Sequence, residues 1–511
     1  MTLDLSPASE LPPLLLGEGK QEATIIDPWH SRQLDVHRWS DHPEIINFVE
    51  SIWNAHFAHL DTEGRSGPKP KRSFKQQLRV VLLDLYVAWL EDPELCIGVA
   101  LSENDWKTWS RYNALGISKK IVTLIHLLEG VGLIDLARGS YSGPWAPYNR
   151  TTRIRAAEPL QAMFRQAKFL RDDIQQVKGQ ECIVLKGGDG DEAKVIDYED
   201  TDATKRMRKE LDAYNLLLAD TFLDIPTLDY PWVTRTNDWG RQVKVQIDHH
   251  HQFVRRIFSR GEWNCNGRFY GPWWQQIDSK LRSQIFINDT PTVEVDFKGL
   301  HVAILSAEKG VVVEDDPYEL PAGTVPGAPP ELQRKLVKKL VLTALNARST
   351  KAAFGSFRDG FPSGHMAKGM TNLELDVLLS SFKEKHPYLA DDLCADRGIR
   401  LMNVDAQIAA LVHRYFTIRN IPVLSVHDSF IVDYTRAAML KRAMGLASRL
   451  IVGRVLRVDA NSVGLDEFDG PVDHCLDFEA WRQTARSAGY LSRLQAWEER
   501  KARGVVSSRR G

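Results

Sequence analysis

Two aspartates, each at the end of an apolar strand-like run, constrain this chain more than any other feature. Asp296 ends the run 291–296 (PTVEVD), and a glycine and the apolar helical pattern LHVAIL follow it. Asp428 lies within 421–432 (IPVLSVHDSFIV), where two apolar strands predict a hairpin with HisAspSer at its turn. A carboxylate beside apolar strands is costly unless a partner neutralises it. Both aspartates are therefore predicted to hold a cation.

Divalent metal ions are the partners that this chemistry favours. Mg²⁺ takes one or two protein carboxylates and completes its shell with water and phosphate oxygens. Two such ions about 4 Å apart hold the attacking and leaving oxygens of a phosphoryl displacement. The sequence thus predicts two Mg²⁺ ions, with Mn²⁺ as an alternative, on Asp296 and Asp428.

A basic helix is predicted between the two aspartates, over residues 331–347. Its members Arg334, Lys338, Leu342 and Asn346 recur every four residues and so share one face. Arginine forks onto phosphate oxygens and lysine supplies a point charge, which together suit a triphosphate. A basic helix face alone is usually just solvated, and the position of this one between the aspartates favours the phosphate interpretation.

These segments, D-F-x-G-L-H, R-x₃-K-x₃-L-x₃-N and V-H-D-S-F, resemble motifs A, B and C of the right-hand palm polymerases. The resemblance is to the DNA polymerase I family and to the single-subunit phage and mitochondrial RNA polymerases. NGRFY at 266–270, with WQQI and LR after it, resembles a further segment of these enzymes, and NVDAQ at 403–407 is a weaker match. The resemblance covers residues from about 260 to 440.

The resemblance implies a role for each matching residue. Asp296 and Asp428 would carry the metals, with Lys338 as a further catalytic group and Arg334 beside it on the nucleotide phosphates. The residues expected to contact primer and template are Arg268, Gln407, His427 and Ser429.

Two departures from the family pattern leave the choice of sugar open. His301 stands where the DNA enzymes have a glutamate that blocks ribose, and Asn346 stands where they have a tyrosine. A bulky imidazole would exclude a 2′-hydroxyl, whereas a hydrogen bond from His301 would select it. The position of His301 favours exclusion, and hence deoxynucleotides.

The region 73–165 resembles a winged helix-turn-helix domain, which uses its second helix to enter the DNA major groove. Ser118 is the expected N-cap of that helix, and strands follow at 133–136 and 151–155. The residues expected to meet bases are Ser118, Lys119, Lys120 and Thr123, and those expected to meet phosphates include Arg138, Arg153 and Arg155. A winged helix that serves only as a scaffold is the alternative.

The expected fold class is α/β (α+β), with a polymerase palm and fingers behind the winged helix. The predicted divisions are an N-terminal segment and linker (1–72), the winged helix (73–165), a helical connector or thumb-like region (166–255), a palm (256–480) with a fingers insertion (306–385), and a tail (481–511) expected to be disordered from Glu498.

Composition excludes several classes of protein. No apolar run reaches the roughly 20 residues that span a membrane, and the N-terminus is a poor signal peptide. The five cysteines are far apart and form no C-x-x-C pair, which fits a reducing cytoplasm. The net charge of −1 requires any nucleic-acid surface to be a local concentration of basic residues.

The sequence therefore predicts a template-directed nucleotidyl polymerase of a mobile element, plasmid or prophage, with DNA and nucleoside triphosphates as partners. DNA synthesis is favoured over a single-subunit RNA polymerase or primase. Two other classes remain open: a DNA-binding replication or regulatory factor with an inactive palm, and a template-independent nucleotidyltransferase.

Overall fold

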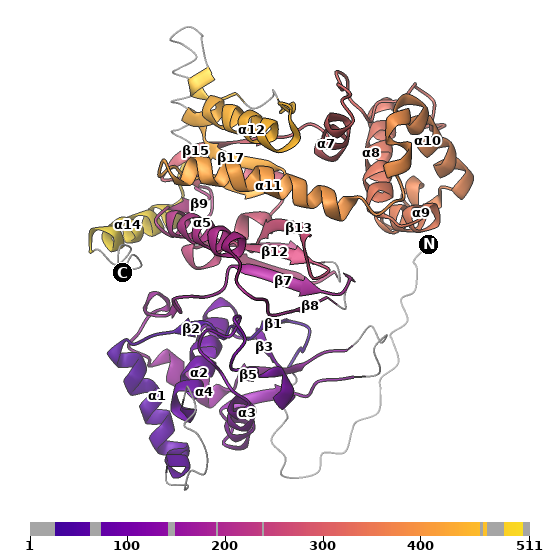
Figure 1. Cartoon of the computed structure of the whole chain (residues 1–511). Coiled ribbons are helices and arrows are strands. Elements are labelled where there is room, and N and C mark those ends of the chain that lie inside the picture. The colour runs from indigo at the N-terminus through magenta and orange to yellow at the C-terminus, as the bar shows by residue number, and fades with distance from the viewer. Residues whose placement is uncertain are drawn as a thin grey trace, which may run out of the picture. The chain divides into compact units, whose positions relative to one another are not determined.

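A computed structural model of the chain describes residues 26–61, 73–141, 149–190, 193–237, 240–459, 463–467 and 485–503. Of the predicted N-terminal segment and linker (1–72), only residues 26–61 are among them. The chain divides into two compact units, 1–180 and 181–511, and each has its own hydrophobic core. Helices and several small sheets make up both units (Figure 1), which confirms the predicted α/β (α+β) class. None of the helices in the described residues has the length and hydropathy needed to cross a bilayer.

The first unit combines helices with a four-stranded sheet of order β1-β3-β5-β4. Its helices are α1 (Pro43–His56), α2 (Phe74–Glu91), α3 (Lys120–Gly130) and α4 (Glu158–Arg165). Its strands are β1 (Ser31–Gln33), β2 (Arg38–Trp39), β3 (Cys96–Val99), β4 (Ile134–Ala137), β5 (Thr152–Ala156) and β6 (Gln175–Gln176). β3 and β4 both pair antiparallel with β5.

Helix α2 is the centre of this unit. A capping box between Ser73 and Gln76 starts it, and most of its residues are buried. Asp84 of α2 has no exposed surface, and the guanidinium groups of Arg32 and Arg38 lie 2.8 and 2.6 Å from its carboxylate. A buried carboxylate is tolerated here because two cations and their hydrogen bonds compensate for its lost hydration.

Residues 100–119, between β3 and α3, contain no α-helix. The structure has only a short 3-10 turn at Glu103–Asp105, followed by irregular turns up to α3.

The second unit contains the segments that resemble polymerase motifs. Its helices are α5 (Asp202–Ala219), α6 (Ser279–Arg282), α7 (Leu300–Glu308), α8 (Pro330–Asn346), α9 (Thr350–Asp359), α10 (Asn372–Lys385), α11 (Gly398–Thr417), α12 (Ala437–Val452) and α14 (Ala488–Ala502). Its strands are β7 (Ile183–Gly187), β8 (Lys194–Val195), β9 (Leu223–Asp224), β10 (Trp232–Thr236), β11 (Gln242–Gln246), β12 (Arg255–Ser259), β13 (Glu262–Tyr270), β14 (Phe286–Ile287), β15 (Thr290–Asp296), β16 (Leu424–Val426) and β17 (Ser429–Asp433).

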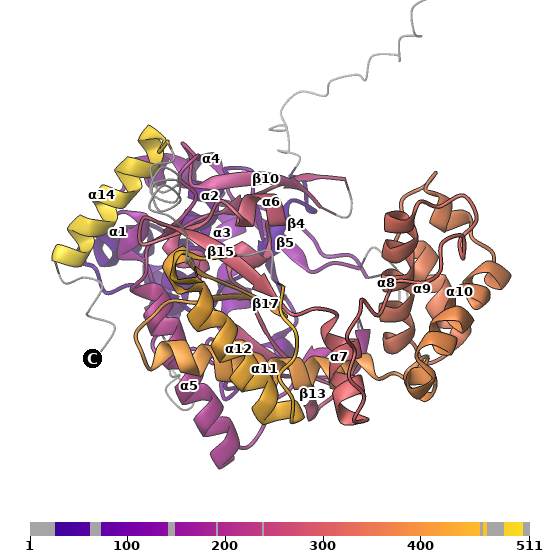
Figure 2. The same cartoon turned by 90° about the horizontal axis from the view of Figure 1, so that it is seen from above.

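An antiparallel sheet of order β16-β17-β15-β14-β9 forms the base of the candidate site. A second sheet has the order β13-β12-β7-β8, and the long helix α11 packs against β13. Figures 1 and 2 both show α8, α9 and α10 gathered in one helical cluster, which α11 connects to the strands. These three helices lie within the predicted fingers insertion.

Two predicted regions differ from the structure. The stretch 166–255 is not mainly helical, because it holds one long helix, α5, among several short strands. Residues from Glu498 are not disordered throughout, because α14 continues to Ala502. Arg493 of α14 forms an ion pair of 2.7 Å with the buried Asp224 of β9, which anchors this helix to the sheet.

A bulge between β12 and β13 depends on one glycine. Gly267 has a φ of +92°, and a Cβ there would lie 2.8 Å from the ring of Phe258 and 3.0 Å from the amide nitrogen of Asn403. Other residues rarely adopt this backbone conformation. The bulge sets the orientation of the next residue, Arg268, whose side chain belongs to the candidate site.

Gly267→Ala is expected to destabilise the second unit by about 1–3 kcal/mol, because alanine adds both backbone strain and a clash. Gly355→Ala in α9 is the matched control, because a Cβ added there would meet no described atom within 4 Å. The control is expected to stabilise the helix by about 0.5–1 kcal/mol. Thermal unfolding of both variants tests this, and equal shifts would contradict the role of the bulge.

Candidate active site

Strand pairing brings the two predicted metal aspartates together. Asp296, the last residue of β15, lies directly opposite Ser429, the first residue of β17. Val426 pairs with Ser429 across the hairpin, which leaves His427 and Asp428 as a two-residue turn. His427 adopts a φ of 58°, a conformation that costs energy in a residue other than glycine. Both aspartates therefore lie at the same end of the sheet.

A third backbone segment, 457–459, lies along the other side of Asp296. Phe297 and Val458 form an antiparallel bridge, and the Asp459 N–H donates to the Asp296 carbonyl at 2.7 Å. This register sets Asp459 opposite Asp296, so that their side chains share one face. The sequence analysis missed Asp459, although the alternating run Arg457-Val458-Asp459 is typical of a strand end.

Electrostatic repulsion is concentrated on Asp296. Desolvation and the charge of Asp428 raise the pKa of the Asp296 carboxyl to about 7, against the opposing effect of Lys338. Neither Asp296 nor Asp428 forms a salt bridge with any residue that the structure describes. Nearby Glu294, by contrast, has the guanidinium of Arg282 at 3.2 Å. Asp296 and Asp428, the two residues that the sequence assigned to metal, thus lack the direct ion pair that Glu294 has.

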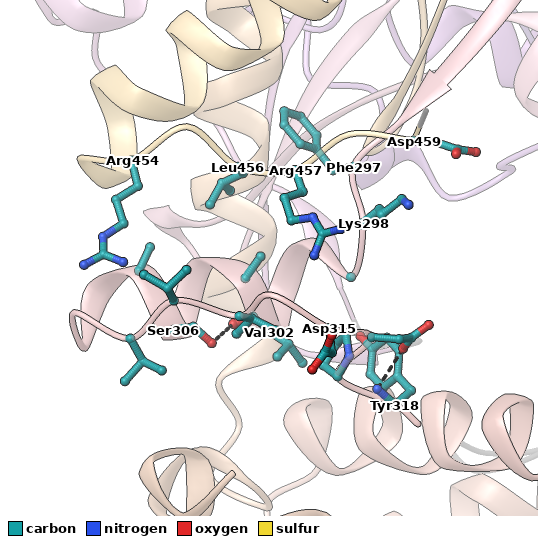
Figure 3. A pocket seen from close by; sticks show the side chains of 18 of the residues that line it. Phe297, Lys298, Val302, Ser306, Asp315, Tyr318, Arg454, Leu456, Arg457 and Asp459 are labelled. Atoms are coloured by element: carbon teal, nitrogen blue, oxygen red, sulfur yellow. Dashed lines mark hydrogen bonds between the residues drawn. The ribbon is translucent and has the colours of Figure 1, made fainter. Parts of the chain in front are cut away.

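A cavity of about 420 Å³ adjoins Asp296 (Figure 3), whereas Asp428 does not belong to its described lining. Its walls come from the end of β15, helix α7, the loop before α8, the exposed face of α8 and the segment 454–459. The charged residues that line it are Asp296, Lys298, Asp315, Asp316, Arg334, Lys338, Arg454, Arg457 and Asp459.

Gly299 makes the change of direction from β15 into α7. Its φ is +57°, and a Cβ there would contact Pro317 at 3.3 Å and Tyr318 at 3.4 Å. The loop that carries Tyr318 therefore closes tightly over the start of α7. Figure 3 shows Val302 and Ser306 of α7 on one side of the cavity, facing the strand-like segment that carries Arg454 and Arg457.

Helix α8 contributes its two predicted cations to this cavity. Arg334 forms an ion pair with Asp316 at 2.5 Å and keeps 44% of its side chain exposed. Lys338, one turn further along, is exposed and lowers the pKa of Asp296 through its charge. Leu342 and Asn346 instead line a separate, more open hollow of about 680 Å³. The single nucleotide-binding face predicted for α8 is therefore divided between two depressions.

His301 occupies a different place from the one predicted. Only 8% of it is exposed, and it lies outside the described lining of the cavity. Its Nε2 lies 3.3 Å from the buried Asp405, which also forms an ion pair with Arg268. The sequence analysis missed Asp405, although NVDAQ contains it. Successive side chains of a helix point in different directions. The next residues of α7, Val302 and Ala303, therefore face the cavity, and His301 does not.

The predicted primer-template residues have unequal exposure. Ser429 is only 6% exposed and donates to the Glu294 carboxylate at 2.6 Å, so its position indicates a structural role. Gln407 is exposed and donates to the Asn403 side chain at 2.8 Å. Burial and the nearby charge of Arg268 lower the pKa of His427, which favours its neutral form.

The residues predicted to contact DNA lie in the first unit. Lys119 and Arg138 are well exposed, at 66% and 70%, and Thr123 is exposed on α3. The ammonium group of Lys120 lies 4.5 Å from the ring centroid of Phe74. Ser118 does not cap α3: the cap is Lys119, and Ser118 forms hydrogen bonds with the buried Gln77.

Two of the predicted phosphate contacts are corrected. Arg155 is 4% exposed and forms ion pairs with Glu94 and with Asp135, so it stabilises the sheet. Arg153 extends across β3 and donates to Ser31 Oγ at 2.8 Å. A run of arginines in the sequence does not reveal which of them have acidic or backbone partners on neighbouring strands.

The carboxylates at the sheet end fit a hard divalent cation. The carboxylates of Asp296 and Asp428 are oxygen donors, burial and the charge of Asp428 raise the pKa of Asp296, and neither carboxylate forms a salt bridge with a described residue. Mg²⁺ and Mn²⁺ prefer such oxygen ligands. Asp296 and Asp428 would be the protein ligands, with Asp459 near them.

Comparisons with known proteins give little further information. No protein-family model matches the chain, and no curated protein matches it. Solved structures similar to the chain include the polymerase domain of Pol1 from M. smegmatis, in complex with a DNA primer-template and dNTP. The identity is 11% and the TM-score 0.28, over 81% of this chain and 65% of that one.

The raised pKa of Asp296 predicts a stability that depends on pH. Its folded-state pKa of about 7 exceeds the ordinary value of 3.8, so the folded chain loses stability as pH rises from about 4 to 7. Asp296→Asn removes the charge and is expected to raise the thermal midpoint at pH 8 much more than at pH 5, in EDTA. Added Mg²⁺ should stabilise the wild type at pH 8 but not the variant.

Asp376→Asn is the matched control for this measurement. Asp376 is exposed on α10 and does not line the cavity. Its variant should show no such dependence on pH or Mg²⁺. A midpoint that shifts equally at both pH values for Asp296→Asn would rule out the crowding of carboxylates.

Proposed function

We propose that the chain is a template-directed nucleotidyl polymerase, with DNA synthesis favoured, that works by two-metal phosphoryl transfer. The observation that carries this proposal is the meeting of Asp296 and Asp428 at one end of an antiparallel sheet, beside a cavity that Arg334 and Lys338 line. Metal-binding carboxylates beside a cationic cavity match the needs of a nucleoside triphosphate.

Asp296 and Asp428 would hold the metal ions. When bound, two Mg²⁺ ions supply charge stabilisation for the attacking hydroxyl oxygen and the leaving phosphate oxygen. In the reaction the 3′-hydroxyl of the primer forms a bond to the α-phosphorus of the nucleotide. The bond between that phosphorus and the bridging oxygen breaks, pyrophosphate leaves, and the proton of the hydroxyl passes to solvent water.

Helix α8 would orient the triphosphate and stabilise its developing charge. Lys338 lies close enough to Asp296 to influence its pKa, and it has no salt bridge within the described part of the chain. Arg334 is held by Asp316 at 2.5 Å and would exchange this partner for a phosphate. Since the pair is partly exposed, the exchange costs little.

The sugar preference would depend on the buried group of Arg268, Asp405 and His301. His301 is hydrogen-bonded to these partners and does not line the cavity, so it would act on the nucleotide through the position of Arg268. The preference for deoxynucleotides accordingly remains a proposal that rests on the motif resemblance.

The first unit would bind duplex DNA through a winged helix. The order α2, β3, α3, β4, β5, with β5 between β3 and β4, supports this proposal. The irregular stretch before α3 stands where a helix-turn-helix has its first helix. Lys119, Thr123 and Arg138 remain exposed for contact with DNA.

The catalytic proposal is tested by incorporation of labelled nucleotides on a primer-template. Asp296→Ala and Asp428→Ala should each abolish incorporation, and Asn should fail at both positions because it lacks the charge that holds Mg²⁺. Lys338→Ala should raise KM and lower kcat, with a loss of about 2–4 kcal/mol of transition-state stabilisation. Lys335→Ala is the control, because Lys335 is exposed on α8 but does not line the cavity.

The same assay separates the competing functions. Incorporation without template would indicate a template-independent nucleotidyltransferase, and exclusive use of NTPs would indicate an RNA polymerase or primase. Wild-type incorporation by either aspartate variant would overturn the metal assignment. Duplex binding without any incorporation would favour a replication or regulatory factor.

DNA binding by the first unit predicts a salt effect. Lys119→Ala and Arg138→Ala in the full chain should each weaken duplex binding and reduce the slope of log K against log[salt] by about one unit. Arg165→Ala, an exposed arginine on α4, is the control and should leave the slope unchanged. Unaltered slopes in all three variants would assign DNA binding to another surface.

A further inference from the structure

We propose that Lys298 and Arg457 form a phosphate-binding pair on one wall of the cavity. This wall, called the strand wall, consists of the residues that follow β15 and the segment 457–459. The pair would take the terminal phosphates of the nucleotide and the pyrophosphate that leaves. This inference rests on the proposed function and adds a second set of cations to those of α8. Neither residue was assigned a role from its sequence.

The backbone register sets Lys298 and Arg457 opposite each other. The Lys298 N–H donates to the Arg457 carbonyl at 2.9 Å, one step beyond the bridge between Phe297 and Val458. In this antiparallel register Lys298 lies opposite Arg457, as Asp296 lies opposite Asp459. Alternate residues of a strand share a face, so the cation pair and the acidic pair lie next to each other.

Like charges directly opposite each other destabilise a strand pair. Two such pairs of opposite sign, in adjacent positions, would neutralise each other if they formed diagonal salt bridges. Lys298 and Arg457, however, form no salt bridge with any residue in the described ranges. Their charges are therefore left to an external anion or to water.

The position of Lys298 and Arg457 favours an external anion over water as their partner. Both residues line the cavity that also contains Asp296, Arg334 and Lys338. Figure 3 shows Lys298 and Arg457 on neighbouring backbone segments at the side of the cavity away from Tyr318. Arg334 and Lys338 contribute from α8, so the cavity has cations from two separate elements. Cations from two elements around one cavity favour a bound anion over solvation of each side chain by water alone.

The arrangement matches a bound triphosphate that extends away from the metal aspartates. The acidic pair is at the sheet end where the metals would bind, and the cationic pair is the next step along the same face. Along this face, the carboxylates that would bind metal are therefore followed by the cations that would bind phosphate. Arginine and lysine are the side chains that bind phosphate oxygens most strongly.

Direct binding of inorganic pyrophosphate, measured by calorimetry on the full chain with Mg²⁺, tests the proposal. Lys298→Ala and Arg457→Ala should each weaken binding by about tenfold or more, as for other hydrogen bonds to charged groups. Arg457→Lys should retain more binding than Arg457→Ala. The control is Arg449→Ala, because Arg449 is exposed near the end of α12 and does not line the cavity.

Thermal unfolding without ligand supplies a second measurement. Removing one of two opposed cations should leave the midpoint unchanged or raise it. A lower midpoint in Lys298→Ala and Arg457→Ala, in proportion to the loss of binding, would show a structural role and overturn the proposal.

The result also separates this proposal from the proposed function. If Lys338→Ala weakens pyrophosphate binding and Arg457→Ala does not, the strand-wall pair is rejected and the polymerase proposal stands. If neither variant weakens binding, the cavity is not a phosphate site and both proposals fail.

Discussion

The position of Asp296 on a strand with partners on both sides is the constraint on which the site depends. Ser429 lies opposite it on β17 and Asp459 lies opposite it on the segment 457–459. Backbone hydrogen bonds therefore fix the carboxylate where it cannot move away from neighbouring negative charge. The cost of burying this carboxylate near the charge of Asp428 appears as a pKa raised to about 7. A bound cation would remove that cost, which is the physical reason to expect metal here.

The cavity beside Asp296 is lined by side chains of both charges. Cations come from α8 and from the strand wall, while carboxylates come from the sheet end and from the loop that holds Asp316. Arg334 already has Asp316 as a partner, whereas Lys338 has no salt bridge among the described residues. Before any ligand binds, Arg334 is thus restrained by an ion pair, whereas Lys338 can bind a phosphate without first breaking one.

Local sequence patterns were enough to predict much of the central sheet and helix α8. The run 291–296 and the hairpin around Asp428 read as strands because apolar residues dominate them, and α8 follows from its four-residue spacing. Asp405 and Asp459 were missed because their importance depends on neighbours more than 100 residues away in the chain. Arg155 was assigned to phosphate because its partners, Glu94 and Asp135, lie 61 and 20 residues away in the chain and cannot be read from its neighbours.

Counting bound metal ions tests the central claim most directly. Titration of the full chain with Mn²⁺, followed by electron paramagnetic resonance in the presence of a nucleotide that cannot react, reports both their number and their proximity. Two ions at about 4 Å should give a spin-coupled spectrum. The coupled signal should disappear in Asp296→Asn and in Asp428→Asn. A wild-type chain that binds only isolated Mn²⁺, or variants that keep the coupled signal, would contradict a metal centre built on these two aspartates.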